Sequence, residues 1–246
     1  MKICCIIPAA GRGTRLNHDR PKVFVPILRD KTIFDFLYSL VSPHCDGINL
    51  VLSPDGENYK NLIPVDRRIE ISIQDEAIGM GDAIFKGHEF WSKFDYVYII
   101  WGDQVNVSQN TMSLMTTYAQ KKRPVIPLTR QPDPYVEYEF DDNNSLYNIK
   151  QSREGDQCKE GGLSDIGLFG LPVESLKTYW DEYLQNPEMG NQTNEVNFLP
   201  FLTFLEKNKY LHFERFIVPD INESKGVNTP EDLLFFQKHF SELKAS

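Results

Sequence analysis

The chain has 246 residues, 41% of them hydrophobic, which is enough to bury one substantial core, and we expect a single domain spanning 1–246. Its 35 acidic and 26 basic residues give a net charge of -9, which argues against nucleic acid or an anionic membrane as a partner, because a polyphosphate surface would repel the chain. The four cysteines lack zinc-ligand spacing, and no secretory leader or membrane-length apolar run is found, so we expect reduced thiols and a cytoplasmic protein.

The first half of the chain alternates short apolar runs with helical patterns. Residues 3–7 are continuously apolar, which predicts a strand buried on both faces, and the apolar spacing in 32–41 predicts a helix. The remaining predicted elements of this half are strands at 48–52, 69–73, 96–100 and 125–128 and helices at 82–91 and 109–120. Because helices of this size imply crossover connections, the predicted fold class is α/β, with a Rossmann-like, mostly parallel, twisted sheet flanked by helices.

The pattern changes after residue 135. An alternating run at 135–140, a turn-forming cluster at 141–144 and an extended pattern at 146–150 predict an inserted antiparallel hairpin, which we expect near the substrate site. The rest of the chain is predicted as a strand at 163–171, a helix at 174–184, a loop at 186–192, a helix at 195–205, a strand at 212–218 and a helix from Pro230 onward.

A glycine-containing loop directly follows the first strand. Segment 8–16 reads Pro-Ala-Ala-Gly-Arg-Gly-Thr-Arg-Leu, and small residues let its backbone approach a ligand while Arg12, Arg15 and Lys22 neutralise phosphate oxygens. Ligands of open α/β sheets bind at the carboxyl ends of strands, so this loop predicts a phosphate site rather than an ordinary surface turn. The dinucleotide pattern fails at Leu16 and no P-loop Gly-Lys-Ser/Thr follows, which disfavours nicotinamide enzymes and P-loop ATPases.

The loop carries a family signature. A strand followed by Ala-Ala-Gly-x-Gly-Thr-Arg at 9–15 and Pro-Lys at 21–22 resembles the sugar-nucleotide nucleotidyltransferases, which are MobA-like NTP transferases with a GT-A-like fold. The chain most resembles the uridylyltransferase domain of the bifunctional enzyme that makes UDP-N-acetylglucosamine. Four further matching segments lie in the family's order at 74–83, 101–103, 164–167 and 226–228. The resemblance therefore covers nearly the whole chain.

The resemblance implies which residues bind the nucleotide. In that family a glutamine and the small residues of the first loop hold the base, and a side-chain amide can both donate and accept hydrogen bonds at a base edge. The corresponding residues here are Ala9, Ala10, Gly11, Gly13, Gln74 and Gly79. The ordinary alternative for Gln74 is a polar residue at the end of a strand.

Magnesium is the predicted cofactor. Asp103 follows the strand at 96–100 on the same sheet edge as the glycine loop, and a carboxylate there suits a hard cation that prefers oxygen ligands. The resemblance implies Asn228 as the second ligand. The alternatives are a turn-forming aspartate at 103 and, at 228, the start of the last helix with Thr229 as its cap. In the catalytic roles, Arg15 would stabilise the triphosphate and the leaving pyrophosphate, and Lys22 would offset charge at the α-phosphate.

The implied reaction transfers a nucleoside monophosphate from a nucleoside triphosphate, with UTP favoured, to a sugar 1-phosphate. Its catalysis rests on positioning and electrostatics, and no protein nucleophile is required. The resemblance implies Gln151, Asp165 and Glu195 as acceptor-binding residues. Both Gln151 and Asp165 depart from the family's pattern, which has glutamate and asparagine there, and Met80 replaces a threonine.

These departures leave the acceptor open, because an anionic Asp165 cannot donate a hydrogen bond as an amide does. One alternative is a cytidylyltransferase acting on a non-sugar phosphorylated alcohol or a phosphonate. A second is a non-catalytic relative that senses nucleotide. The acetyltransferase chemistry of the bifunctional relatives is not predicted.

Overall fold

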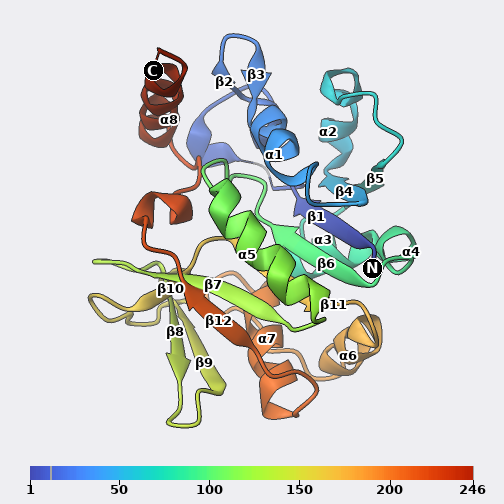
Figure 1. Ribbon diagram of the computed structural model, residues 1–246, viewed down its shortest axis with the longest axis vertical. Helices are drawn as coiled ribbons and strands as arrows, with labels where there is room; N and C mark the ends of the chain where they lie inside the picture. The colour runs from blue at the N-terminus through green and yellow to red at the C-terminus, as the bar shows by residue number, and fades with distance from the viewer. Residues whose placement is uncertain (12, 246) are drawn as a thin grey trace.

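An eight-stranded sheet forms the centre of the protein (Figure 1). The computed structural model describes residues 1–11 and 13–245. Strands β1, β4, β5, β6, β7 and β12 run parallel, and β10 and β11 run antiparallel to them. The strands of this sheet are β5 (Ile69–Ile73), β4 (Gly47–Leu52), β1 (Ile3–Pro8), β6 (Tyr96–Ile100), β11 (Leu168–Pro172), β10 (Leu163–Asp165), β7 (Val125–Arg130) and β12 (Glu214–Ile217). The predicted α/β fold class is confirmed.

Helices cover both faces of this sheet. They are α1 (Ile33–Val41), α2 (Pro54–Glu57), α3 (Met80–Lys86), α4 (His88–Trp91), α5 (Gln109–Gln120), α6 (Leu176–Tyr183), α7 (Phe198–Lys207) and α8 (Pro230–Ala245). In Figure 1, α1 and α5 cover the face turned toward the viewer, where α8 contributes Phe236 to the same core. Helices α3, α4, α6 and α7 supply the core of the opposite face.

Strand β1 explains why the first apolar run has no polar gaps. Its side chains alternate between the two cores, with Ile3, Cys5 and Ile7 on one face and Cys4 and Ile6 on the other. A strand covered by helices on both faces must be apolar at every position, and all six residues of β1 are buried.

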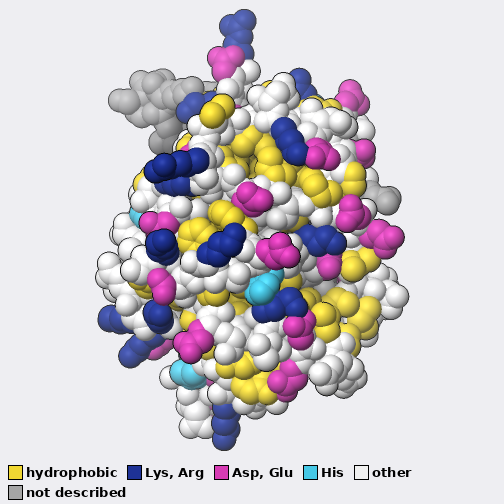
Figure 2. Space-filling model, turned by 90° about the vertical axis from the view of Figure 1, so that its right-hand side faces the viewer, with side chains coloured by type: hydrophobic (Ala, Val, Ile, Leu, Met, Phe, Trp, Pro, Cys, Tyr) yellow, Lys and Arg dark blue, Asp and Glu magenta, His cyan; other side chains and the backbone are white. Residues whose placement is uncertain are grey.

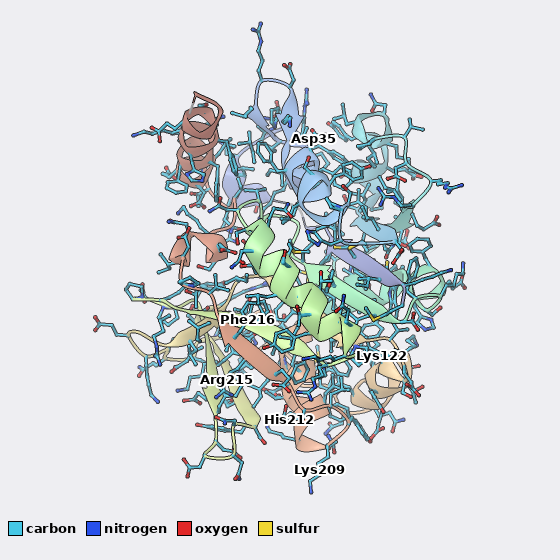
Figure 3. All side chains as sticks on the ribbon, in the orientation of Figure 1. Asp35, Lys122, Lys209, His212, Arg215 and Phe216 are labelled. Carbon is cyan, nitrogen blue, oxygen red and sulfur yellow. The ribbon has the colours of Figure 1, made fainter. Side chains whose placement is uncertain are left out.

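Helix α1 begins at a well-formed cap. The Thr32 hydroxyl accepts a hydrogen bond from the Asp35 N–H, and the Asp35 carboxylate accepts one from the Thr32 N–H at 2.7 Å. This reciprocal arrangement satisfies two backbone donors that have no partner within the helix. Asp35 stands at the start of the helix in Figure 3.

The predicted hairpin is confirmed as β8 (Val136–Phe140) and β9 (Leu146–Gln151). Arg215 of the edge strand β12 reaches its turn, where Nη2 donates to Asn144 Oδ1 at 2.7 Å (Figure 3). The Arg215 guanidinium also lies 3.8 Å from the centre of the Phe140 ring. Helix α7 packs against β9, so the hairpin is fixed to the body of the protein both at its turn and at its second strand.

A glycine divides the predicted strand at 163–171 into β10 and β11. Gly167 has a φ of 73°, a conformation that side-chain-bearing residues rarely adopt, and its N–H donates to Asp165 Oδ1 at 2.7 Å.

The prediction of one continuous helix at 82–91 is wrong, because two helices, α3 and α4, meet there at Gly87. A Cβ at Gly87 would lie 1.7 Å from Asn49 Oδ1. The side chain of Asn49 is fully buried on β4, so the break lets the backbone pass over a polar group inside the core.

The predicted helix at 195–205 begins three residues late, as α7 at Phe198. The residues before it are extended, and the Val196 N–H donates to the Ile78 carbonyl at 3.3 Å. The small antiparallel sheet of β2 (Pro26–Leu28) and β3 (Lys31–Thr32) was not predicted.

Charged side chains of both signs are interspersed with apolar ones on the face drawn in Figure 2. The four cysteines are free, and Cys158 is half-buried whereas the other three are buried. Within residues 1–11 and 13–245, no helix is both long enough and apolar enough to cross a membrane.

Candidate active site

A cavity of about 790 Å³ opens at the edge of the sheet where the parallel strands β1, β5 and β6 end. This is the edge at which open α/β sheets bind ligands. The predicted site residues that line it are Ala9, Ala10, Gly11, Gly13, Arg15, Lys22, Gln74, Gly79, Asp103, Glu195 and Asn228. The fold therefore brings together residues from nearly the whole length of the chain.

The glycine loop packs tightly at the carboxyl end of β1. Gly13 has a φ of 59°, and a Cβ there would lie 2.8 Å from the Cβ of Lys22. Glycine is thus required for the loop to turn while lying against the segment that carries Lys22. The Ala9 N–H donates to the Val51 carbonyl at 2.8 Å, which ties the loop to the neighbouring strand. Arg12 lies outside the described residues.

Two cations and two oxygen-bearing side chains meet beside this loop. The Lys22 ammonium donates to Asp103 Oδ2 at 2.6 Å and to Asn228 Oδ1 at 2.8 Å. Arg15 Nη2 donates to the same Asn228 oxygen at 3.3 Å. The Lys22 and Asp103 side chains are only 20% and 17% exposed, so water screens their attraction less than on an open surface.

The segment carrying Asn228 lies directly on Asp103. The Val227 N–H donates to the Asp103 carbonyl at 3.0 Å, and a Cβ at Gly226 would lie 2.9 Å from Asp103 Cγ. Thr229 begins α8, because its hydroxyl accepts from the Asp232 N–H at 3.2 Å and its own N–H donates to Asp232 Oδ2 at 3.0 Å. Thr229 thus caps the helix, while the Asn228 side chain faces Lys22 and Arg15 and stays a predicted metal ligand.

Asp103 and Asn228 form a donor set that fits a magnesium ion. One charged and one neutral oxygen converge on a single positive charge, the Lys22 ammonium, which shows that the two side chains can share a cation. A hard divalent cation prefers oxygen ligands and takes the remainder from water and phosphate.

Gln74 stands at the end of β5 with its side chain only 5% exposed. Its Nε2 donates to Asp82 Oδ2 at 2.9 Å and to the Gly79 carbonyl at 3.1 Å. Gly79 has a φ of 136°, and a Cβ there would lie 2.5 Å from the Val196 carbonyl oxygen. The segment around Gly79 is therefore held between Gln74 and the extended residues before α7.

Arg153 and Glu195 also line the cavity. Arg153 Nη2 donates to Glu195 Oε2 at 2.8 Å. The neighbouring Glu154 is buried and anchors the loop that carries Glu195, accepting from the Thr193 hydroxyl at 2.8 Å and from Asn197 Nδ2 at 3.2 Å. Burial alone would raise the pKa of Glu154, but the hydrogen bonds from this loop outweigh it and hold the pKa below its usual value.

Two predicted acceptor residues do not line this cavity. Gln151 lies on β9, where its N–H donates to Asp156 Oδ2 at 2.9 Å. Asp165 is half-buried with Oδ1 turned to the Gly167 N–H, and burial raises its pKa to about 6, with a further increase from the nearby negative charge of Asp103. The sequence did not single out Arg153, which lies two residues from Gln151 in a stretch without a recognisable motif.

Comparisons with known proteins show the family and the fold of the chain. The family model for the MobA-like NTP transferase domain matches residues 5–173, well over half of the chain. The chain is similar to the bifunctional protein GlmU of Thermotoga petrophila, with 23% identity over 95% of the chain and 50% of the relative. It is also similar to GlmU of Clostridium perfringens, with 25% identity over 95% of the chain and 51% of the relative. It spans about half the length of these curated relatives.

A solved structure of UDP-glucose pyrophosphorylase in complex with UDP-glucose has the same fold. It superposes with a TM-score of 0.75 at 17% identity, covering 98% of this chain and 99% of the other. The chain belongs to the family of MobA-like NTP transferase domains.

Proposed function

We propose that the protein transfers a nucleoside monophosphate from UTP to a sugar 1-phosphate and releases pyrophosphate, forming a nucleotide sugar. The observation that carries this proposal is that Arg15, Lys22, Asp103 and Asn228 contact one another in the wall of a single cavity. A reaction between two anionic phosphates needs this combination of fixed positive charge and cation-binding oxygens.

The cavity offers separate regions for the two substrates. The base would lie against Ala9, Ala10 and Gln74, and the triphosphate would follow the glycine loop toward Arg15. The acceptor would occupy the region of Arg153 and Glu195. The size of the cavity suits this arrangement, because pockets for small molecules span roughly 300 to 1,000 Å³.

In the proposed reaction, an oxygen of the acceptor phosphate attacks the α-phosphorus in line with the leaving group. The new P–O bond forms as the bond to the bridging oxygen of pyrophosphate breaks, and pyrophosphate departs with the electron pair. Lys22 would supply positive charge beside the α-phosphate, and Arg15 would stabilise charge on the leaving group. Magnesium held by Asp103 and Asn228 would neutralise and orient the phosphate oxygens.

The relatives support the choice of substrates. The fold neighbour is a UDP-glucose pyrophosphorylase bound to UDP-glucose, and it matches the chain along its full length. The second candidate, a cytidylyltransferase for a non-sugar acceptor, keeps the same chemistry and differs in the base and the acceptor.

The test is pyrophosphate release with each common nucleoside triphosphate, paired with a panel of sugar 1-phosphates, phosphorylated alcohols and phosphonates. We expect turnover to require magnesium and to be greatest with UTP and a sugar 1-phosphate. Asp103→Ala should lower turnover at least about 100-fold, because charge stabilisation at a transition state contributes on that scale. Asp181→Ala is the matched control, since this exposed aspartate forms an ion pair with Lys177 on α6 and does not line the cavity, so turnover should be unchanged.

Three results would contradict the proposal. Full turnover by Asp103→Ala would remove the assigned metal site. Greatest turnover with CTP and a non-sugar acceptor would favour the second candidate. Nucleotide binding without pyrophosphate release across the whole panel would make the protein a nucleotide sensor.

A further inference from the structure

The side-chain amide of Gln74 has no donor left for a ligand. An amide nitrogen carries two hydrogens, and Nε2 spends one on Asp82 Oδ2 and the other on the Gly79 carbonyl. Among the described residues, no hydrogen bond is made to Oε1. The carbonyl oxygen is therefore the atom of Gln74 that can contact a base.

Both partners of Nε2 fix which way the amide points. A backbone carbonyl only accepts hydrogen bonds, and so does an ionised carboxylate. Turning the Gln74 amide around would bring Oε1 against the oxygens of Gly79 and Asp82 and take the Nε2 donor away from both. The Gly79 carbonyl would keep only the Ala83 N–H, at 3.3 Å, and the change is costly for a group that is only 5% exposed. The bond to Asp82 is also charge-assisted and so stronger than the bond to the Gly79 carbonyl.

We infer that Asp82 is a positioning residue for base selection: it holds the Gln74 amide with its oxygen toward the base and so favours uracil over cytosine. Uracil presents an imide N–H between its two carbonyl oxygens, and this N–H can donate to Gln74 Oε1. The corresponding nitrogen of cytosine carries no hydrogen and is itself an acceptor, so it would repel Gln74 Oε1. The inference rests on the proposed function only in requiring that the cavity bind a nucleoside triphosphate.

The position of Asp82 allows it to act on Gln74 without contacting the nucleotide. It lies in the first turn of α3 and is half-buried, and it does not line the cavity as Gln74 and Gly79 do. A purely structural acid at this position would stabilise the helix and affect all nucleotides alike. A positioning residue instead changes the ratio between two bases.

The experiment measures dissociation constants of UTP and CTP by calorimetry with magnesium present and no acceptor. We expect the native protein to bind UTP on the order of tenfold more tightly than CTP, or better. This is the change in dissociation constant that the loss of one polar contact usually causes. In Asp82→Ala the ratio should fall several-fold toward one, because Gln74 can turn. Asp82→Asn should keep most of the ratio, since its Oδ1 can still accept from Nε2.

Glu89→Ala is the matched control, because Glu89 is an exposed acid in the first turn of the neighbouring helix α4 and should leave the ratio unchanged. A native protein that binds CTP as tightly as UTP would overturn the inference without any variant. So would an Asp82→Ala protein, folded by circular dichroism, that binds both nucleotides more weakly with an unchanged ratio.

These results separate the inference from the proposed function. If UTP binds selectively but no sugar 1-phosphate turns over, the acceptor assignment fails and the role of Asp82 stands. If sugar 1-phosphates turn over with UTP but Asp82→Ala leaves the ratio of dissociation constants unchanged, the role of Asp82 fails and the proposed function stands.

Discussion

Lys22 links the stability of the site to its chemistry. Its ammonium lies between Asp103 and Asn228, so the half-buried carboxylate has a positive partner within the protein itself. A charge removed from water without such a partner is strongly destabilising. The same lysine that is proposed to act on the α-phosphate therefore also compensates the negative charge of Asp103.

At Gly79 we predict a loss of stability on adding a single methyl group. Gly79→Ala would hold an alanine at a φ of 136° with its Cβ 2.5 Å from the Val196 oxygen, so the two segments must move apart. We expect the free energy of unfolding to drop by about 2 kcal/mol or more, as is usual for strain combined with a clash. Urea denaturation measures this loss.

Gly11→Ala is the control for this prediction, because a Cβ at Gly11 would meet nothing within 4 Å. It should change the free energy of unfolding by less than about 0.5 kcal/mol. Equal losses in the two variants would show that the contact with Val196 does not matter.

The sequence could predict the site residues that belong to short, ordered motifs. Lys22 and Asp103 follow strands or turns whose ends are set by local patterns, and the parallel topology then brings them to one edge. Arg153 could not be predicted, because its partner Glu195 is 42 residues away in the sequence. The two side chains meet because Glu154 holds the loop that carries Glu195. No local pattern records such a contact.

Among the elements, the loop before α7 depends on a buried carboxylate. Glu154 accepts from the backbone of Gln192 at 2.8 Å as well as from the side chains of Thr193 and Asn197. Glu154→Gln should lower the free energy of unfolding by about 1 to 3 kcal/mol, since an amide N–H would face donors that have lost their acceptor. Denaturant unfolding checks this, with the exposed Glu160→Gln as control. An unchanged stability would mean that the loop is held by its other contacts.

Element boundaries show where sequence patterns stop being informative. The apolar run that continues through Gly167 and the helical spacing that continues through Gly87 look unbroken, because hydrophobic periodicity reports burial and not hydrogen bonding. At Gly167 the N–H donates to the side chain of Asp165, and at Gly87 the side chain of Asn49, which is distant in sequence, leaves no room for a Cβ. Both breaks lie beside such side-chain contacts, which the hydrophobic pattern does not record.

At the scale of the molecule, carboxylates of two kinds set the response to pH. The pKa of Asp165 is raised from 3.8 to about 6, so its ionisation destabilises the folded state as pH rises through this range. Hydrogen bonds and Lys150 lower the pKa of Glu139, and hydrogen bonds to the loop lower that of Glu154. These two groups stabilise the folded state above about pH 4.5, and that contribution is lost as pH falls through their folded pKa values.

Asp165→Asn should therefore raise the free energy of unfolding at pH 8 by on the order of 2 kcal/mol and have little effect at pH 3.5, where the native carboxyl is already neutral. The asparagine oxygen can still accept from the Gly167 N–H, so the local turn is kept. Denaturant unfolding from pH 3 to pH 8 checks the sign. A gain of the same size at both pH values would mean that ionisation of Asp165 is not the cause.

The overall architecture was the most predictable property, because it follows from the order of apolar runs and the helices between them. The antiparallel orientation of β11, which lies between β6 and β7, could not be predicted from the sequence. An apolar run indicates a buried strand but does not indicate whether that strand runs parallel or antiparallel to its neighbours.

The hydrogen bond between Lys22 and Asn228 joins residues that are 206 positions apart. A chain emerging from the ribosome exposes its glycine loop and Asp103 well before Asn228 appears. The nascent protein thus has the basic residues of the proposed phosphate site early, whereas the proposed pair of magnesium ligands is complete only once residue 228 has been added. We therefore expect nucleotide to stabilise the folded protein only after the segment that begins α8 has been synthesised, so that ligand binding reports on folding across the whole sheet.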